Sequence, residues 1–323
     1  MKLVTVQRGD VQAAGCLIGS DVLDFGLASA MLSLPGDDTV TVARILDFDA
    51  AGGGQARSIL AAVEQADAAT LARLREGGAL MAFEAVTLAA PLPHPTTLFS
   101  HGQAYHSHAR DWDPAAPAEQ PRHPPVGFLK AVSSITGSGS AIHLPRRAPD
   151  MVDFEGEFCV VFGRDCHGAS RDDAMDYVAG YTIINDVSAR DWIPMMRAPV
   201  DAPVQTYAAL NMMFKSFRSF CPMGPCVVTK DEIADYHDLT LTTRLNGEVM
   251  QHASIRDLIW DIPELIEHYA SIHAFKAGDV MSTGTPGGVG MGRDPWVFLR
   301  HGDRIEVEVA EVGTLSNIVM GPA

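Results

Sequence analysis

Cysteine is scarce in this chain, and acidic residues outnumber basic ones. Only five of its 323 residues are cysteine, an odd number without a CxxC pair, which argues against a disulfide framework or a structural zinc site. Lysine and arginine number 24 against 40 acidic residues, so the formal net charge is −16. This charge argues against nucleic acid as a partner, because phosphate binding needs clustered lysine and arginine. A small anionic substrate needs only a local positive site.

Long apolar runs are also lacking. No run approaches the ~18 residues of a membrane span, so we expect no association with a membrane. Ala13-Ala14-Gly15-Cys16 resembles a lipoprotein cleavage box, but the residues before it are too polar to form a signal region. Because three cysteines adjoin apolar residues, as reduced core cysteines do, the sequence predicts a protein of the cytoplasm, a reducing compartment.

The length of the chain suggests two domains. Pro91, Pro93 and Pro95 interrupt regular structure, and we place the boundary there. This gives a small α/β N-terminal domain over residues 1–90 and a catalytic domain over residues 91–323.

Secondary-structure signals are mainly those of β-strands. Residues 2–25 predict a hairpin of short strands, and residues 55–76 predict one helix that ends at Gly77-Gly78. The later signals are buried strands at 157–163 and 180–185, a hairpin over 238–251 that turns at Asn246-Gly247, a helix from about Pro263 to Ile272, and two strands within 303–319. The fold class is therefore α+β and β-rich.

Two segments are predicted to be loops. Residues 113–125 hold five prolines, which exclude a helix or a central strand. Such a loop is often a lid or a binding loop, and a plain surface excursion is the alternative. Residues 283–290 are rich in glycine but match neither a P-loop nor a dinucleotide fingerprint. Their backbone amides either approach an anion or simply form a turn.

Glu155 and Glu157 stand two residues apart at the start of the first buried strand. Strand side chains alternate, so both carboxylates share a face, about 6–7 Å apart along the chain, and can converge on one cation. A solvent-facing polar edge is the alternative. Glu157, however, leads directly into Phe158-Cys159-Val160-Val161-Phe162, which has no polar face, and a buried acid needs a partner.

Asp186 follows the second buried strand and adds a third acid. Ser188 and Asp191 offer a capping box for a following helix, which leaves Asp186 free for another role; capping by Asp186 itself is the alternative. Three acids from two strands suit a hard cation with oxygen ligands and open water positions, and they differ from the Cys and His set of a zinc site.

Two cations and a histidine accompany these acids. Arg190 follows Asp186 by four residues. Lys215 lies in an apolar stretch, where a buried lysine either shifts its pKa or has an anionic partner, and a snorkelling surface lysine is the alternative. Asp111 stands three residues after His108, so on a helical turn it orients the imidazole as in a general base. An ordinary surface or core histidine is the alternative.

These segments together resemble the fumarylacetoacetate hydrolase family over residues 97–319. The matching segments are Tyr105-x-x-His108, 153–157, 180–191, Lys215-Ser216-Phe217 with 221–225, Asn246-Gly247-Glu248, Gly278-Asp279, 284–290 and Gly302-Asp303. The combination of E-x-E, N-D-x-S-A-R-D and G-T-P-x-G-x-G is specific to that family. The resemblance implies a catalytic domain with a mixed β-sandwich roll, usually dimeric, that binds Mg²⁺, Mn²⁺ or Ca²⁺.

The resemblance also implies roles for individual residues. The metal ligands would be Glu155, Glu157 and Asp186. The catalytic residues would be His108 as a base on a mobile lid, Asp111 as its partner, and Lys215 in contact with substrate or reaction water. The substrate-binding residues would be Tyr105, Arg190 and Thr285, with Thr285 near the substrate carboxylate and Arg190 supporting the site.

The chain departs from the family pattern near the proposed base. Many members have glutamate where this chain has Asp111, and asparagine where it has Ala104. The segment over 192–214 is long and contains prolines, so an extra loop at the active site is expected there. The sequence assigns no role to His106.

The reaction that the resemblance implies is hydrolysis of a C–C bond in a 1,3-diketo acid such as an acylpyruvate. Decarboxylation, hydration and isomerisation of a 2-oxo acid are the alternatives within the family, and a non-catalytic protein that binds an oxo acid is the alternative outside it. Trp112 and Trp192 adjoin the site residues, so they either accommodate an apolar or aromatic substituent or belong to the core.

Overall fold

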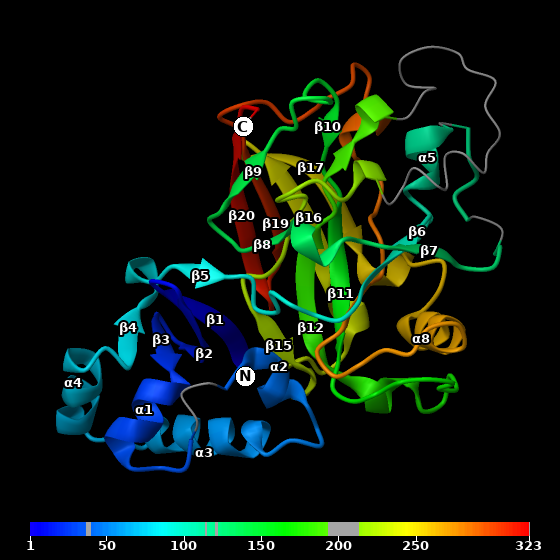
Figure 1. Ribbon diagram of the computed structural model, residues 1–323. Coiled ribbons are helices and arrows are strands. Elements are labelled where there is room, and N and C mark those ends of the chain that lie inside the picture. Colours follow the sequence, from blue (N-terminus) through cyan, green and yellow to red (C-terminus); the bar gives the residue numbers. More distant parts are fainter. Residues whose placement is uncertain (37–39, 114, 120–121, 193–212, 323) are drawn as a thin grey trace.

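The computed structural model describes residues 1–36, 40–113, 115–119, 122–192 and 213–322 (Figure 1). Within them, one mixed sheet of 11 strands runs through both the N-terminal and the later part of the chain. Its order is β4 (Leu80–Ala82), β3 (Asp21–Asp24), β2 (Val11–Ile18), β1 (Lys2–Arg8), β15 (Val227–Thr229), β12 (Val178–Asn185), β11 (Gly156–Phe162), β18 (Val280–Ser282), β6 (Leu98–Gly102) and β7 (Val126–Leu129), while β5 (Leu88–Ala89) pairs with β1.

A second sheet packs on the middle of the first. Its five strands are β17 (Glu248–Ser254), β16 (Thr240–Leu245), β19 (Arg304–Val309), β20 (Gly313–Met320) and β9 (Ala141–His143), in that order. The hairpin of β16 and β17 turns at Asn246-Gly247, where both residues have positive φ, as the sequence predicts. Two short pairs complete the strands: β10 (Val152–Asp153) with β13 (Ser188–Ala189), and β14 (Cys221–Pro222) with β8 (Ile135–Thr136).

The helices gather mainly at the N-terminal end of the chain. These are α1 (Phe25–Leu32), α2 (Val42–Leu46), α3 (Gly52–Glu64) and α4 (Ala68–Glu76), which lie beside β1–β4 at the lower left of Figure 1. Later in the chain, the described residues include α5 (Ala109–Trp112) and α8 (Ile262–Ala270). Asp261 and Glu264 form a capping box at the start of α8, and Pro263 stands in its first turn, so the predicted helix is confirmed.

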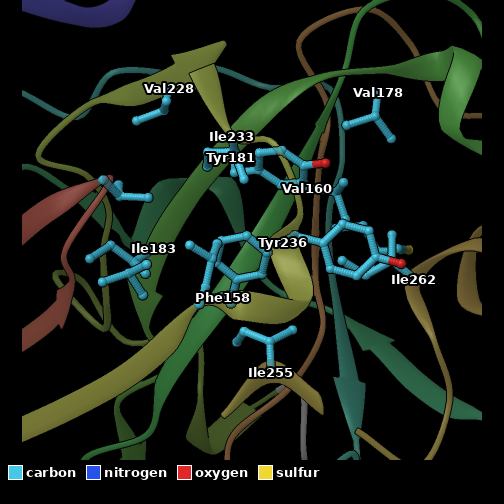
Figure 2. Close-up of a cluster of buried hydrophobic side chains, with 14 of the residues drawn as sticks. Phe158, Val160, Val178, Tyr181, Ile183, Val228, Ile233, Tyr236, Ile255 and Ile262 are labelled. Carbon is cyan, nitrogen blue, oxygen red and sulfur yellow. The ribbon is translucent and has the colours of Figure 1, made fainter. Parts of the chain in front are cut away.

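The alternation of side chains on β11 separates two hydrophobic clusters. Phe158, Val160 and Phe162 pack with the five-stranded sheet and α8, whereas Cys159 and Val161 face a cluster shared with the N-terminal helices. Figure 2 shows the first cluster, in which the rings of Phe158 and Tyr181 stack with centroids 5.2 Å apart. Because both faces of β11 are covered, any acid on this strand is forced into a dry environment.

Two local predictions are wrong. The single helix over 55–76 is divided, because Asp67 caps the amide of Thr70 and starts α4 anew after α3 ends at Glu64; the predicted stop at Gly77 is correct. The predicted capping box is absent, since Ser188 lies in β13 and donates to the carbonyl oxygen of Asp186 (2.9 Å).

Strand pairing joins the N-terminal region to the rest of the chain. Lys2 and Leu3 of β1 pair with Val228 and Val227 of β15, so the main sheet continues from one region into the other. The division of the chain at residue 90 stays a prediction. Among the described residues, the helices are all too short or too polar to cross a membrane.

Candidate metal centre

Three carboxylates meet where β11 begins and β12 ends. Glu157 pairs across the strands with Ile184, so the odd residues of β11 and the even residues that end β12 share one face of the sheet. Glu155, Glu157 and Asp186 therefore converge, and one oxygen of each lies within 4.8 Å of the others. All three side chains are buried. The structure brings together the three acids that the sequence singles out.

Two lysines form ion pairs with two of these acids, Glu155 and Asp186. Lys215 Nζ donates to Glu155 Oε2 (2.5 Å) and to Asp186 Oδ2 (2.7 Å), so the anionic partner predicted for this lysine is confirmed. Lys130 Nζ donates to the other Asp186 oxygen (2.5 Å) and to the backbone carbonyl of Lys215. Sequence reasoning missed Lys130, although it stands in an apolar stretch just as Lys215 does.

Arg190 connects the carboxylates to the glycine-rich loop. Its guanidinium donates to Glu155 Oε1 and, through Nε, to Asp153 Oδ2 (3.0 Å). The other Asp153 oxygen accepts from the amide of Gly290 (2.7 Å). A Cβ at Gly290 would lie 1.8 Å from the carbonyl oxygen of Val297, so only glycine allows this approach. The anion that accepts from the backbone amide of Gly290 in the glycine-rich loop is thus the carboxylate of Asp153.

The cluster holds more acidic than basic side chains, and this raises the pKa of one of the acids. Burial, reinforced by the charges of Asp186 and Glu155, raises the pKa of Glu157 well above its usual range, and Ser282 Oγ donates to this carboxyl (2.5 Å). Burial acts in the same direction on Glu155, but Lys215 and Arg190 outweigh it and hold the Glu155 pKa below its usual range. One acid of the three is therefore left without a cation of its own.

A charge count shows what the cluster lacks. Four carboxylates face three cations, which are those of Asp153, Glu155, Glu157 and Asp186 against Lys130, Arg190 and Lys215. With all four carboxylates ionised, one negative charge would be left over in a buried place, and this cost is what raises the pKa of Glu157. A divalent cation on the three carboxylates would reverse the sign of that balance. The donor set is all oxygen, so the residues fit Mg²⁺, Mn²⁺ or Ca²⁺.

His108 and Asp111 form a pair close to this cluster. His108 immediately precedes α5, and its Nδ1 lies 2.8 Å from Asp111 Oδ2, so the predicted contact is confirmed. Asp111 also accepts from the amide of Gly288 (3.0 Å), which fixes the carboxylate against the glycine-rich loop. The His108 imidazole lies near enough to Glu155 to contribute to the lowered pKa of that acid.

The two remaining predicted residues are buried beside the metal ligands. Thr285 Oγ1 donates to the carbonyl oxygen of Gly156 (2.9 Å) and accepts from Gln251 Nε2 (2.8 Å), so its hydroxyl braces the residue between two of the acids. Burial raises the pKa of Tyr105, and the charge of Glu157 adds to this effect. Contact of either side chain with a substrate stays a prediction.

The predictions for the two tryptophans and for the loop over 192–214 have different outcomes. Trp112 is half exposed, whereas Trp192 packs against Phe217 with ring centroids 5.7 Å apart, at the edge of a buried cluster. The expected extra loop over 192–214 lies almost wholly outside the described residues, at 193–212.

Together the fold and the cluster define a class: a β-rich protein with a buried set of carboxylates suited to a divalent cation. Residues 97–320 match the profile of the fumarylacetoacetate (FAA) hydrolase C-terminal family. The chain belongs to this family.

Named relatives and a solved structure are similar to the chain over most of its length. It is 38% identical over 242 residues to the oxaloacetate tautomerase YisK of Bacillus subtilis, covering 75% of each chain. It is 37% identical over 235 residues to the human mitochondrial oxaloacetate tautomerase FAHD2B, covering 73% of this chain and 70% of the relative. The maleylpyruvate hydrolase of Sphingobium sp. SYK-6, solved with manganese(II) and pyruvate, shares the fold over the whole of both chains, with a TM-score of 0.74 and 24% identity.

Proposed function

We propose that the chain is a divalent-metal-dependent enzyme of 2-oxo acids and that it interconverts the keto and enol forms of oxaloacetate. The observation that carries this proposal is the buried triad of Glu155, Glu157 and Asp186, with Lys215 against two of its members. The named activity of the relatives that are 37–38% identical to this chain over the aligned residues supports the choice of substrate.

Keto–enol conversion moves one proton from C3 to the carbonyl oxygen or back. It needs a site for the carboxylate, an electrophile at the carbonyl oxygen and a group that carries the proton. A bound Mg²⁺ or Mn²⁺ supplies Lewis-acid polarisation of the oxygens of the substrate. Asp186 and Glu155 raise the pKa of Lys215 against the opposing effect of burial, so the ammonium stays charged and can donate to the developing oxyanion.

His108 is the group placed to carry the proton. With Nδ1 donating to Asp111, Nε2 is left to take a proton from the substrate and to return it. The same pair supports a second candidate, hydrolysis of an acylpyruvate, because an imidazole oriented by a carboxylate can equally deprotonate water. Only hydrolysis cleaves a carbon–carbon bond and releases pyruvate, so pyruvate release distinguishes the two reactions.

The test starts from enol-oxaloacetate diluted into buffer, with loss of its ultraviolet absorbance followed in metal-stripped and Mg²⁺- or Mn²⁺-restored protein. We expect faster ketonisation only with the metal, and total oxaloacetate should stay constant. Glu157→Gln should abolish the acceleration, and Glu248→Gln, an exposed acid on β17, is the matched control. Metal-independent ketonisation would contradict the proposal, and pyruvate release from an acylpyruvate would favour the hydrolase.

We propose a homodimer as the working assembly, as the family resemblance implies. Light scattering coupled to size-exclusion chromatography tests this, and a monomeric mass in the active fraction would refute it.

A further inference from the structure

A cavity of about 480 Å³ opens beside His108. His108 contributes to its wall from the start of α5, and the ends of β6 and β7 contribute His101, Gly102 and Val126. The remaining described wall is formed by Gln103, Ala109, Trp112, Asp113, Ala116, Pro117, His123, Pro124, Pro125, Ile259 and Trp260. A space of this size holds a drug-sized molecule, which is far more than the four carbons of oxaloacetate require.

His108 and β7 link the cavity to the candidate metal centre: His108 lines the cavity and acts on the pKa of Glu155. Val126 lines the cavity, the ring of Phe128 lies 5.4 Å from Lys215 Nζ, and Lys130 ion-pairs with Asp186. At a rise of about 3.4 Å per residue, Val126 and Lys130 stand roughly 14 Å apart along the chain. A substrate with its oxo-acid group at the carboxylates would therefore extend its other end past His108 into the cavity.

The wall is mainly apolar, and its described residues include no lysine or arginine. Among its described residues only Asp113 has a formal charge, and that charge is negative. Burial lowers the pKa of His101 to about 4, so this imidazole is neutral near pH 7. The guanidinium of Arg122, the residue before His123 of the wall, stacks on the ring of Trp260 at 4.1 Å and donates to Glu264 (2.6 Å), so its charge is already compensated.

We propose that this cavity binds the uncharged tail of a 2-oxo acid, with aryl groups preferred and a second carboxylate at the tail disfavoured. The proposal rests on the proposed function, because the oxo-acid group must occupy the carboxylate site. A mainly apolar wall with Trp112 and Trp260 gains from burying a ring, whereas a carboxylate there would lose its hydration without a lysine or arginine of the wall to compensate.

Phenylpyruvate and 4-carboxyphenylpyruvate are a matched pair of probes, since they differ only in charge at the far end. Calorimetric titration into Mg²⁺-loaded protein should show phenylpyruvate binding at least tenfold more tightly than its carboxylated analogue. Trp112→Ala and Trp260→Ala should each weaken phenylpyruvate roughly tenfold relative to oxaloacetate. Trp296→Ala, which removes an equally exposed tryptophan outside the cavity, should leave both affinities unchanged.

The titration reports on the cavity independently of turnover. Equal affinity for the two aryl acids, or no effect of either tryptophan variant on phenylpyruvate, would overturn the cavity proposal even if oxaloacetate is tautomerised. Failure of the proposed function would instead show as absence of metal-dependent ketonisation, with the selectivity between the two aryl acids measured separately.

Discussion

Removal of the divalent cation should lower the melting temperature of the protein by an amount that the carboxylate cluster sets. A cation that binds only the folded state adds about 2.7 kcal/mol when its concentration is 100 times its Kd. Unfolding entropy is about 2.1 cal/mol/K per residue, so 323 residues correspond to roughly 0.7 kcal/mol/K. We therefore expect restored Mg²⁺ or Mn²⁺ to raise the melting temperature by about 4 °C.

Glu157→Gln separates the metal from the fold in this experiment. Glutamine keeps the length of the side chain and can still accept from Ser282 Oγ, while it removes the buried acid that Asp186 and Glu155 repel. The metal-free variant should therefore melt at or above the temperature of the metal-free wild type. Its shift on adding the cation should fall below about 1 °C, since one charged ligand in three is gone.

Differential scanning fluorimetry at one scan rate, with chelated and metal-restored samples, measures both quantities. Glu248→Gln is the control, because it removes an equal charge from an exposed position. A full shift in Glu157→Gln would refute the metal assignment. A metal-free variant that melts well below the wild type would show that the carboxylate instead stabilises the fold.

Three further outcomes follow from single contacts. Lys130→Met should lower the free energy of unfolding of metal-free protein by about 3 kcal/mol in urea, because it breaks a fully buried pair with Asp186; an unchanged midpoint would contradict this. Gly292→Ala should lower kcat at least roughly tenfold with little effect on KM, because its Cβ would lie 2.3–2.5 Å from Asp111 and displace the partner of His108. An unaltered kcat would argue against a role of Asp111 in orienting His108. The pKa of His101 is about 4 when folded and about 6.5 when unfolded, so between these values only the unfolded chain takes up the proton, and stability falls as the pH drops from about 6.5 to about 4. The loss in free energy of unfolding should reach about 3 kcal/mol. Denaturation of wild type and of His101→Asn, each at pH 7 and at pH 4.5, measures most of this loss as the larger drop in wild type.

The sequence predicts those parts of the structure whose signals are local. Asn246-Gly247 dictates its hairpin because both residues accept positive φ, and the apolar runs of β11 and β12 identify buried strands without further information. The carboxylate triad could also be predicted, since strand alternation places Glu155 and Glu157 on one face and Asp186 ends the neighbouring strand.

The missed features depend on contacts between distant segments. Lys130 and Asp186 are far apart in the chain, and only the fold shows that the lysine reaches this acid and the backbone of Lys215. The apolar surroundings of Lys130 were nevertheless a usable signal, the same one that identified Lys215. The division of the predicted helix at Asp67 was missed for a different reason. Good helix formers stand on both sides of this residue, and they hide the signal of a single capping aspartate.

The pairing of β1 with β15 has a consequence for biosynthesis. Strand β1 is made well before β15, so Lys2 and Leu3 lack their strand partners until residues 227 and 228 have been made. Until then this end of the β1 edge is open to pairing with other chains, whereas Thr5 and Val6 can already pair with Ala89 and Leu88 of β5. Completion of the main sheet is therefore a late and non-local step in folding.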